Sequence, residues 1–268
     1  MAKNNRTEWP EEGEGYLEIS EKGFGFLRSP GNRFQSKPSD VFVTPDTIRS
    51  KYLREGCFIK GRLVPPHKGH SPQLKEIYSV NEMPFKEYTE CSRFENLTTI
   101  DPLDKFNLET TPEELETRII DLVTPIGKGT RGLIVASPRT GKTTILKQIC
   151  NAVTTNHPEV KTIVLLIDER PEEVTDFERS VEAEVVASSN DMDLETHVRL
   201  SRFMVERCRR MVECGQDVFM LMDSITRIAR AYNNVKGGSG RTMSGGVDAR
   251  ALEIPRRMFA AARNIEDG

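Results

Sequence analysis

The most specific chemical pattern in the sequence is a loop that leads into a helix. It reads Ala136-Ser137-Pro138-Arg139-Thr140-Gly141-Lys142-Thr143-Thr144, a phosphate-binding P-loop with alanine in place of the first glycine. In such a loop, backbone amides and the helix N-terminus face the phosphates of a nucleotide. Gly141 permits a close backbone approach, Lys142 faces the β- and γ-phosphates, and the Thr143 hydroxyl ligates Mg²⁺. A chance turn is the alternative, which the flanking apolar runs disfavour, so we expect ATP and Mg²⁺ to bind here.

An aspartate stands where the second half of such a site is expected. Asp223 follows the apolar run 218–222, so its carboxylate should project from the end of a buried strand toward a phosphate-bound Mg²⁺. The alternative role is an N-cap of the following helix, which is predicted over 224–232. Because a P-loop is present, the metal role is the favoured interpretation.

A second acidic position follows another apolar run, 163–167. ATP hydrolysis needs a group that orients or deprotonates the attacking water, and Glu169 is the candidate for this role. Arg170 could contact the nucleotide or a neighbouring subunit. The alternative is a plain cluster of acids at a strand end, since Glu172 and Glu173 follow. The predicted catalytic set is therefore Glu169, Lys142 and Asp223.

A glycine-rich turn lies shortly before the P-loop and reads Gly127-Lys128-Gly129-Thr130-Arg131-Gly132. It precedes a predicted strand and does not open a helix, so it is not a dinucleotide-binding fingerprint. Local spacing leaves two interpretations open. The turn is either a flexible entry to the strand or a supporting wall of the nucleotide pocket.

The elements that must position these residues alternate between strand and helix from residue 119 onward. The runs 133–136, 163–167 and 218–222 are apolar throughout, as expected for strands of a parallel sheet that is covered on both faces. The segments 143–153 and 200–212 have helical spacing of apolar residues. Residues 119–268 are therefore predicted to form a doubly wound α/β domain.

The preceding part of the chain, residues 15–90, reads as short strands separated by Gly and Pro turns. Strands of this length and spacing predict a small all-β barrel, of which the OB and cold-shock folds are examples. Residues 1–14 are polar and predicted to be disordered. Residues 91–118 are predicted to form a linker with an entry helix.

Two aromatic residues and a cation share one face of a predicted barrel strand, namely Phe24, Phe26 and Arg28. Exposed rings beside a cation form a stacking platform for unpaired bases. Asp40 and Phe42 could add a hydrogen-bond acceptor and a third ring. The alternative is that the rings fill the barrel core, and spacing alone leaves this open. The predicted RNA-binding residues of the barrel are Gly23, Phe24, Gly25, Phe26, Leu27, Arg28, Asp40, Val41 and Phe42.

A second candidate RNA-binding surface is the glycine-rich segment 236–246. Such a segment does not hold one shape unaided, so a disordered linker is one interpretation. A loop carrying Arg241 inside a catalytic domain could instead contact a phosphate backbone and respond to the bound nucleotide. The residues concerned are Arg241, Thr242, Met243, Ser244, Gly245 and Gly246.

Charge and cysteine usage narrow the class of protein. The net charge is −3, yet residues 22–75 carry an excess of +8 and the remainder about −11, which suggests a basic binding module joined to an acidic catalytic one. The five cysteines show no CxxC spacing, which predicts neither a metal site nor a disulfide framework. Without a secretion signal or a long apolar run, the protein is expected in the cytoplasm.

Taken together, these features resemble the bacterial transcription termination factor Rho family over residues 16–268. A lone P-loop would not be specific, but this combination in this order is. The segments that carry the resemblance are Gly23-Phe24-Gly25-Phe26-Leu27-Arg28, Phe94-Glu95-Asn96-Leu97-Thr98, Pro125-Ile126-Gly127-Lys128-Gly129, Arg131-Gly132-Leu133-Ile134-Val135-Ala136, Asp168-Glu169-Arg170-Pro171-Glu172-Glu173-Val174, Asp223-Ser224-Ile225-Thr226-Arg227 and Gly245-Gly246-Val247-Asp248-Ala249.

The resemblance implies an OB-type barrel followed by a RecA-like P-loop ATPase domain. It implies a homohexameric helicase that binds nascent single-stranded RNA, hydrolyses ATP between subunits and releases RNA from the polymerase elongation complex. It implies that Glu169 is the catalytic carboxylate and that Arg170 contacts nucleotide. It also places residues 127–132 at the nucleotide pocket and residues 242–246 in a secondary RNA loop.

Three departures from the family leave questions open. The barrel begins almost at once, without a preceding helical bundle. Leu74 stands near a position where the family favours tyrosine, which leaves base preference undecided. The chain ends at Gly268, where the family continues with an arginine finger. Two alternatives to an RNA-dependent ATPase stay open. One is an RNA- and ATP-binding fragment without turnover, because the arginine finger is missing. The other is a RecA-like NTPase with no nucleic-acid role.

Overall fold

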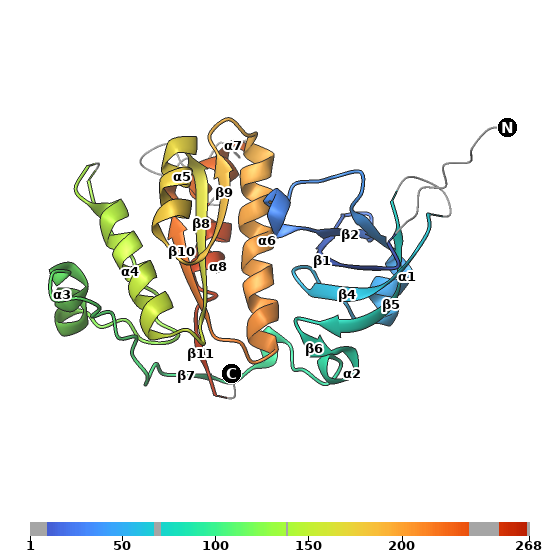
Figure 1. The fold of residues 1–268 in the computed structure, drawn as a ribbon, viewed down its shortest axis with the longest axis horizontal. Helices are drawn as coiled ribbons and strands as arrows, with labels where there is room; N and C mark the ends of the chain where they lie inside the picture. Colours follow the sequence, from blue (N-terminus) through green and yellow to red (C-terminus); the bar gives the residue numbers. More distant parts are fainter. Residues whose placement is uncertain (1–9, 67–70, 138, 236–251, 267–268) are drawn as a thin grey trace. The chain divides into compact units, whose positions relative to one another are not determined.

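The computed structural model describes residues 10–66, 71–137, 139–235 and 252–266 (Figure 1). The chain divides into two compact units. The first unit comprises Met1–Ser92 together with Glu206–Cys214, and the second comprises Arg93–Val205 together with Gly215–Gly268.

The first unit is a closed, mostly antiparallel barrel. Its strands run in the order β3-β2-β1-β4-β5, and a parallel pairing of β3 with β5 at Phe42 and Gln73 closes the ring. Closure leaves no free edge among these five strands, which is how small β folds avoid edge-to-edge association. The elements are β1 (Glu12–Ile19), β2 (Gly25–Arg28), η1 (Pro30–Asn32), β3 (Val41–Val43), α1 (Pro45–Ser50), β4 (Phe58–Val64), β5 (Gln73–Val80), β6 (Met83–Pro84) and α2 (Phe85–Tyr88).

Alternation along the strands fills the barrel. Leu17, Leu27 and Val43 are at most 3% exposed, because every second side chain of a strand faces the same side. Leu74 is 1% exposed and belongs to this core. Leu74, which stands near a position where the family favours tyrosine, is therefore a packing residue in this chain.

The last part of a long helix, α6 (Leu194–Glu213), contributes residues 206–213 to the first unit. Asn81 Nδ2 donates to the carbonyl oxygen of Arg210 at 2.7 Å, and Arg54 Nη1 donates to Glu213 Oε1 at 2.6 Å. Arg207 Nη2 donates to the Tyr16 hydroxyl at 2.8 Å. These contacts give partners to the side chains of Asn81, Arg54 and Arg207, as burial of polar groups requires.

The second unit is an α/β domain around a parallel sheet. In the described part, β8 (Lys161–Glu169) lies between β10 (Val218–Asp223) and β9 (Glu184–Ser189), and both pairings are parallel. Val164 and Leu166 of β8 pack with residues of α4 (Lys142–Asn156) and α5 (Pro171–Ser180), and α6 lies on the opposite side of the sheet from α4 (Figure 1). The remaining elements are η2 (Phe94–Asn96), β7 (Thr99–Ile100), α3 (Leu115–Val123), α7 (Ile225–Val235), α8 (Glu253–Phe259) and β11 (Asn264–Ile265).

One predicted strand is absent from the structure. Residues 133–136 were expected to be buried, but they form no strand, and the side chains of Leu133 and Val135 are 63% and 87% exposed. An apolar run becomes a strand only when a neighbouring strand takes up its backbone hydrogen bonds. Among the described residues, the sheet consists of β10, β8 and β9, and the run 133–136 pairs with neither of its edges. The prediction of a buried strand at this place was wrong for the structure as described.

No helix in the described ranges is both long enough and apolar enough to cross a lipid bilayer.

The close pairing of β4 with β5 gives a test of the barrel. A Cβ added at Gly61 would lie 2.0 Å from the carbonyl oxygen of Glu76. We expect Gly61→Ala to lower the free energy of unfolding by at least about 1–3 kcal/mol, the usual cost of overpacking. The matched control is Gly31→Ala, whose added Cβ meets nothing closer than 3.6 Å. Thermal unfolding followed by circular dichroism measures both, and equal melting temperatures would contradict the described register.

Candidate nucleotide site and nucleic-acid interface

The P-loop leads directly into α4. The helix begins at Lys142, and Gly141 before it has a φ of +88°, a conformation that glycine adopts without steric cost. Thr140 Oγ1 donates to the carbonyl oxygen of Ser137 at 2.8 Å and closes the loop. The predicted residue Pro138 lies outside the described residues. The helix N-terminus with its free amides is therefore presented as an anion-binding end.

The structure brings Lys142 and Asp223 together from positions far apart in the sequence. Lys142 Nζ lies 2.5 Å from Asp223 Oδ1, and Asp223 is 5% exposed. The capping alternative for Asp223 is not what the structure shows, because the amide of Arg227 donates to Ser224 Oγ at 3.3 Å. Ser224 is thus the residue that caps α7, and the carboxylate of Asp223 faces the P-loop lysine.

Glu169 occupies the end of β8 and is 3% exposed. Its Oε1 lies 3.0 Å from Arg227 Nη2 and accepts a hydrogen bond from the amide of Arg170 at 3.2 Å. Burial raises the pKa of the Glu169 carboxyl, and the Arg170 amide and the Arg227 charge oppose that rise. The carboxylate is therefore buried, held in place by a cation, and harder to ionise than an exposed glutamate.

The backbone turns sharply just before Glu169. Asp168 has a φ of +57°, and the pairing of β8 with β9 shifts register between Ile167 and Glu169. Arg227 Nη1 donates to the carbonyl oxygen of Asp168. A bulge of this kind re-aims the side chains at a strand end, so the bulge and Arg227 together set where the carboxylate of Glu169 points.

Two residues of this site were not singled out from the sequence, Arg227 and His197. His197 is 2% exposed, its Nδ1 lies 2.8 Å from Ser188 Oγ, and its Nε2 lies 3.9 Å from Asp168 Oδ1. Arg227 had a weak signal, since it follows Asp223 in the first turn of a predicted helix. His197 had none, because a single histidine in an amphipathic helix is usually a satisfied packing residue.

The glycine-rich turn at 127–132 has a supporting role in the described contacts. Gly127 and Thr130 bond to each other through both amides, at 3.1 and 2.9 Å. Lys128 Nζ lies 2.5 Å from Asp217 Oδ2 and 3.8 Å from Glu159 Oε1. Asp217 and Glu159 precede β10 and β8, so these contacts lie at the amino ends of the strands. A contact between this turn and a nucleotide stays a prediction.

The donors near the P-loop suit a magnesium–nucleotide complex. Mg²⁺ in such sites is held by one or two protein oxygens in addition to phosphate oxygens, and the Thr143 hydroxyl and the Asp223 carboxylate are of this kind. In the described ranges no group of three or more His, Cys, Asp or Glu side chains could hold a metal by itself. The arrangement therefore fits a metal that arrives with phosphates.

On the first unit, three aromatic rings gather outside the barrel core. The ring centroids of Phe24, Phe26 and Phe42 lie 5.6–5.8 Å apart in every pairing. All three side chains are half-buried, whereas Leu27 and Val43, which alternate with them, belong to the core. The alternative that these rings fill the barrel is therefore not observed, and an aromatic surface patch is left on β2, on β3 and on Phe24, which directly precedes β2.

A cation lies at the border of this patch. The guanidinium carbon of Arg28 is 5.1 Å from the centroid of Phe26, within the range of a cation–π contact. Arg28 Nε lies 2.6 Å from Glu18 Oε2, and Arg28 Nη1 is paired with Asp40. The Asp40 carboxylate also accepts from the amide of Lys37 at 2.8 Å. Asp40 thus orients Arg28, and its acceptor capacity is already partly used.

The other candidate RNA-binding residues, Arg241 to Gly246, lie outside the described residues.

Both halves of the chain match known protein families. The family profile described as "Rho termination factor, RNA-binding domain" matches residues 13–86. The profile described as "ATP synthase alpha/beta family, nucleotide-binding domain" matches residues 116–246. Transcription termination factor Rho of Cereibacter sphaeroides is 47% identical over 96% of this chain, that of Pseudomonas aeruginosa 48% and that of Escherichia coli 45% over the same share.

This chain is a homologue of transcription termination factor Rho. Its antiparallel barrel corresponds to the Rho RNA-binding domain, and its parallel sheet belongs to a nucleotide-binding domain of the ATP synthase type. The chain spans 62% of the length of these three Rho relatives.

Solved structures of ATPases have a fold similar to that of this chain. A prototypical ATPase from the type III secretion system of pathogenic bacteria shares 24% identity with a TM-score of 0.53, covering 65% of this chain and 50% of the other. The assembled ATPase EscN from the enteropathogenic E. coli type III secretion system shares 24% sequence identity with this chain at a TM-score of 0.52. The match covers 62% of this chain and 39% of the other. At this identity the likeness speaks for the fold alone.

The buried carboxyl of Glu169 makes stability depend on pH. Because its pKa is raised on folding, the native state holds this proton more tightly than the unfolded state, and the free energy of unfolding falls as pH rises between the ordinary and the raised pKa. At neutral pH the ionised group therefore costs stability. We expect Glu169→Gln to raise the melting temperature at pH 7 and to lose that advantage near the ordinary pKa of about 4.3.

The matched control for this measurement is Glu172→Gln, a nearby exposed carboxylate. Its melting temperature relative to the parent should not change between the two pH values. If Glu169→Gln is less stable than the parent at pH 7, the prediction is contradicted. The ion pair with Arg227 would then contribute more to stability than burial of the ionised carboxylate costs.

Proposed function

We propose that this chain is an RNA-directed, ATP-hydrolysing subunit that acts in transcription termination. The observation that carries the proposal is the contact of Lys142 with Asp223 beside a P-loop, in a chain whose other unit matches the Rho RNA-binding domain. The barrel binds nascent single-stranded RNA, and ATP hydrolysis drives translocation along it until RNA leaves the transcription complex. The assembly is a homohexamer that acts on the RNA polymerase elongation complex in the cytoplasm.

The phosphate end of the proposed nucleotide site contains an ion pair. Lys142 and Asp223 neutralise each other at 2.5 Å, and each would have a partner of opposite charge in Mg·ATP. Lys142 would take the β- and γ-phosphates, while Thr143 and Asp223 would hold the metal. Mg²⁺ when bound supplies neutralisation of the charge on the phosphate oxygens. Arg139, Thr140 and Thr144 complete the loop around the phosphates.

The proposed catalytic carboxylate is prepared by its surroundings. Glu169 is buried, and Arg227 holds its Oε1 at 3.0 Å. A general base works best when its pKa lies near the working pH, and burial raises the pKa of Glu169 in that direction. Glu169 would orient the attacking water and accept its proton, while Arg170 at the start of α5 contacts nucleotide.

The proposed RNA contact is the aromatic patch of the barrel. Half-buried rings offer faces on which unpaired bases stack, and stacking tolerates different sequences because every base has a π-face. Phe24, Phe26 and Phe42 supply three such rings. Arg28 adds a cation beside them, and its pairing with Glu18 and Asp40 fixes its direction. The segment carrying Arg241 is proposed as a second contact.

An ATPase assay with and without pyrimidine-rich single-stranded RNA tests the function. We expect turnover that depends on RNA, and loss of both nucleotide binding and turnover in Lys142→Ala, because the charge that faces the phosphates is gone. Turnover that is indifferent to RNA would instead favour an NTPase without a nucleic-acid role. RNA binding and Mg·ATP binding with no turnover would leave a binding fragment.

Removal of one ring tests the RNA contact separately. Stacking of a base on an aromatic side chain is worth about 1–3 kcal/mol, so Phe26→Ala should weaken RNA binding by about 5–150-fold and leave nucleotide binding unchanged. Tyr52→Ala is the matched control, since Tyr52 is 72% exposed and lies outside the aromatic patch. Fluorescence anisotropy with labelled RNA measures both variants. Equal affinity for Phe26→Ala and the parent protein would remove Phe26 from the interface.

A further inference from the structure

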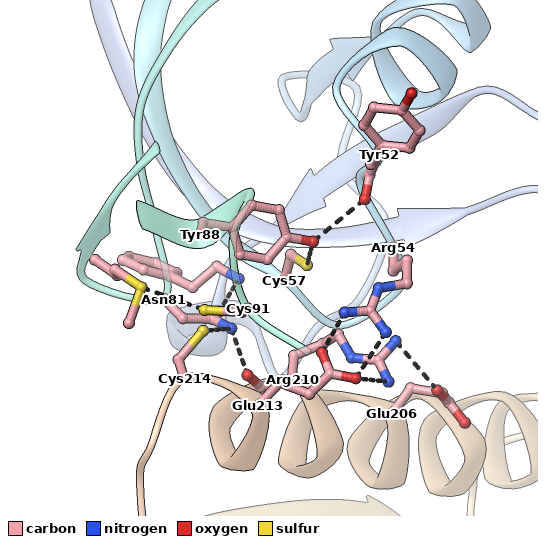
Figure 2. A network of polar contacts seen from close by, with 12 residues as sticks. Tyr52, Arg54, Cys57, Asn81, Tyr88, Cys91, Glu206, Arg210, Glu213 and Cys214 are labelled. Carbon is pink, nitrogen blue, oxygen red and sulfur yellow. Dashed lines mark hydrogen bonds and ion pairs between the residues drawn. The ribbon is translucent and has the colours of Figure 1, made fainter. Parts of the chain in front are cut away.

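Three sulfur atoms from separate segments meet in the first unit. Cys91 Sγ lies 3.5 Å from Met83 Sδ and 3.7 Å from the carbonyl oxygen of Glu87. Figure 2 shows Cys91 and Cys214 side by side, next to Asn81. Cys91 and Cys214 are both half-buried, so the group can be reached from solvent. We call Met83, Cys91 and Cys214 the sulfur cluster.

A buried polar side chain holds one member of the cluster. Asn81 is 5% exposed, and its Nδ2 lies 3.4 Å from Cys214 Sγ and donates to the carbonyl oxygen of Arg210 at 2.7 Å. Asn81 Oδ1 in turn accepts from the amide of Phe58 at 2.7 Å. Both ends of the amide are thus engaged, which fixes its orientation. Asn81 therefore orients the Cys214 sulfur, as hydrogen-bond partners of the ligands do in metal sites.

The chemistry of the cluster selects a soft ion. Two thiols and one thioether are the donors that Cu(I) prefers, whereas Mg²⁺ and Ca²⁺ prefer oxygen. With a metal–sulfur bond of about 2.3 Å, three sulfurs in a trigonal plane lie about 4 Å apart. The 3.5 Å between Cys91 Sγ and Met83 Sδ is close to this spacing, so only small side-chain movements would be needed.

We propose that Met83, Cys91 and Cys214 form a binding site for a soft monovalent metal ion, with Cu(I) as the ion of best fit. Binding releases the two thiol protons to solvent and forms two metal–thiolate bonds and one metal–thioether bond. No electron is transferred. The site is independent of the nucleotide and RNA functions proposed above.

A disulfide between the same cysteines fits the structure less well. The Cys91 thiol donates to Met83 Sδ at 3.5 Å and to the carbonyl oxygen of Glu87 at 3.7 Å, and Cys214 Sγ accepts from Asn81 Nδ2 at 3.4 Å, so each sulfur is directed to a partner other than the second cysteine. A disulfide would also leave Met83 without a role. Cys57 is not part of the cluster, because it is fully buried and its thiol lies 3.4 Å from the Tyr88 hydroxyl.

Titration of the intact chain with Cu(I) tests the site. A chromogenic Cu(I) chelator competes for the metal under anaerobic, reducing conditions, and we expect one tightly held Cu(I) per chain. Cys91→Ser and Cys214→Ser should each weaken binding by about 100-fold or more, beyond the loss of an outer partner. Met83→Leu keeps the volume of the side chain and should weaken binding by about 10-fold. The control Cys208→Ser should bind as the parent does.

X-ray absorption on the Cu(I)-loaded parent protein reads the ligands without any variant. Three sulfur neighbours at one ion support the proposal. Unchanged Cu(I) affinity in the double variant Cys91→Ser, Cys214→Ser overturns the site. Two sulfur neighbours together with unchanged affinity in Met83→Leu overturn the three-sulfur set.

Discussion

The parallel register of β8 and β10 is the constraint on which the nucleotide site depends. Met222 pairs with Leu165 and Asp223 with Leu166, so both strands end at the same edge of the sheet. Asp223 and Glu169 therefore emerge at one edge, as expected for ligand-binding residues at the carboxyl ends of parallel strands. The P-loop lysine reaches this edge from the start of α4 and meets Asp223.

Burial at this edge has a cost that the fold offsets locally. Glu169 and Asp223 are carboxylates with exposed fractions of 3% and 5%, and an unpaired buried charge is strongly unfavourable. Each has a cation, Arg227 for Glu169 and Lys142 for Asp223. Arg227 also bonds the backbone at Asp168. The same contacts that stabilise the acids therefore fix their positions.

In the barrel, alternation along the strands separates core residues from surface residues. Alternation along β2 and β3 sends Leu27, Val41 and Val43 inward and leaves Phe26 and Phe42 outward. Because β2 and β3 pair with Phe26 directly opposite Phe42, the rings are neighbours across strands, and such aromatic pairs stabilise a sheet. One set of residues thus supports the barrel and leaves an aromatic patch on its surface.

The sequence by itself determined the parts of this protein whose chemistry is local. The P-loop, the acid after each apolar run and the strand alternation of the barrel depend on consecutive residues, so they could be read without a structure. The helices α4 and α7 were likewise predicted to within three residues at each end, whereas α6 begins six residues before the predicted segment 200–212. The run 133–136 was predicted as a strand for the same local reason and is none, because a strand needs a partner.

Only the tertiary structure decided which distant residues meet. The pairing of Lys142 with Asp223, the contacts of Arg227 and His197 around Asp168 and Glu169, and the meeting of Cys91 with Cys214 join segments many residues apart. No spacing rule reaches across such separations, because strand register and helix packing set them. The same holds for whether Phe24, Phe26 and Phe42 face the core or the surface, which the direction of each strand in the closed barrel settled.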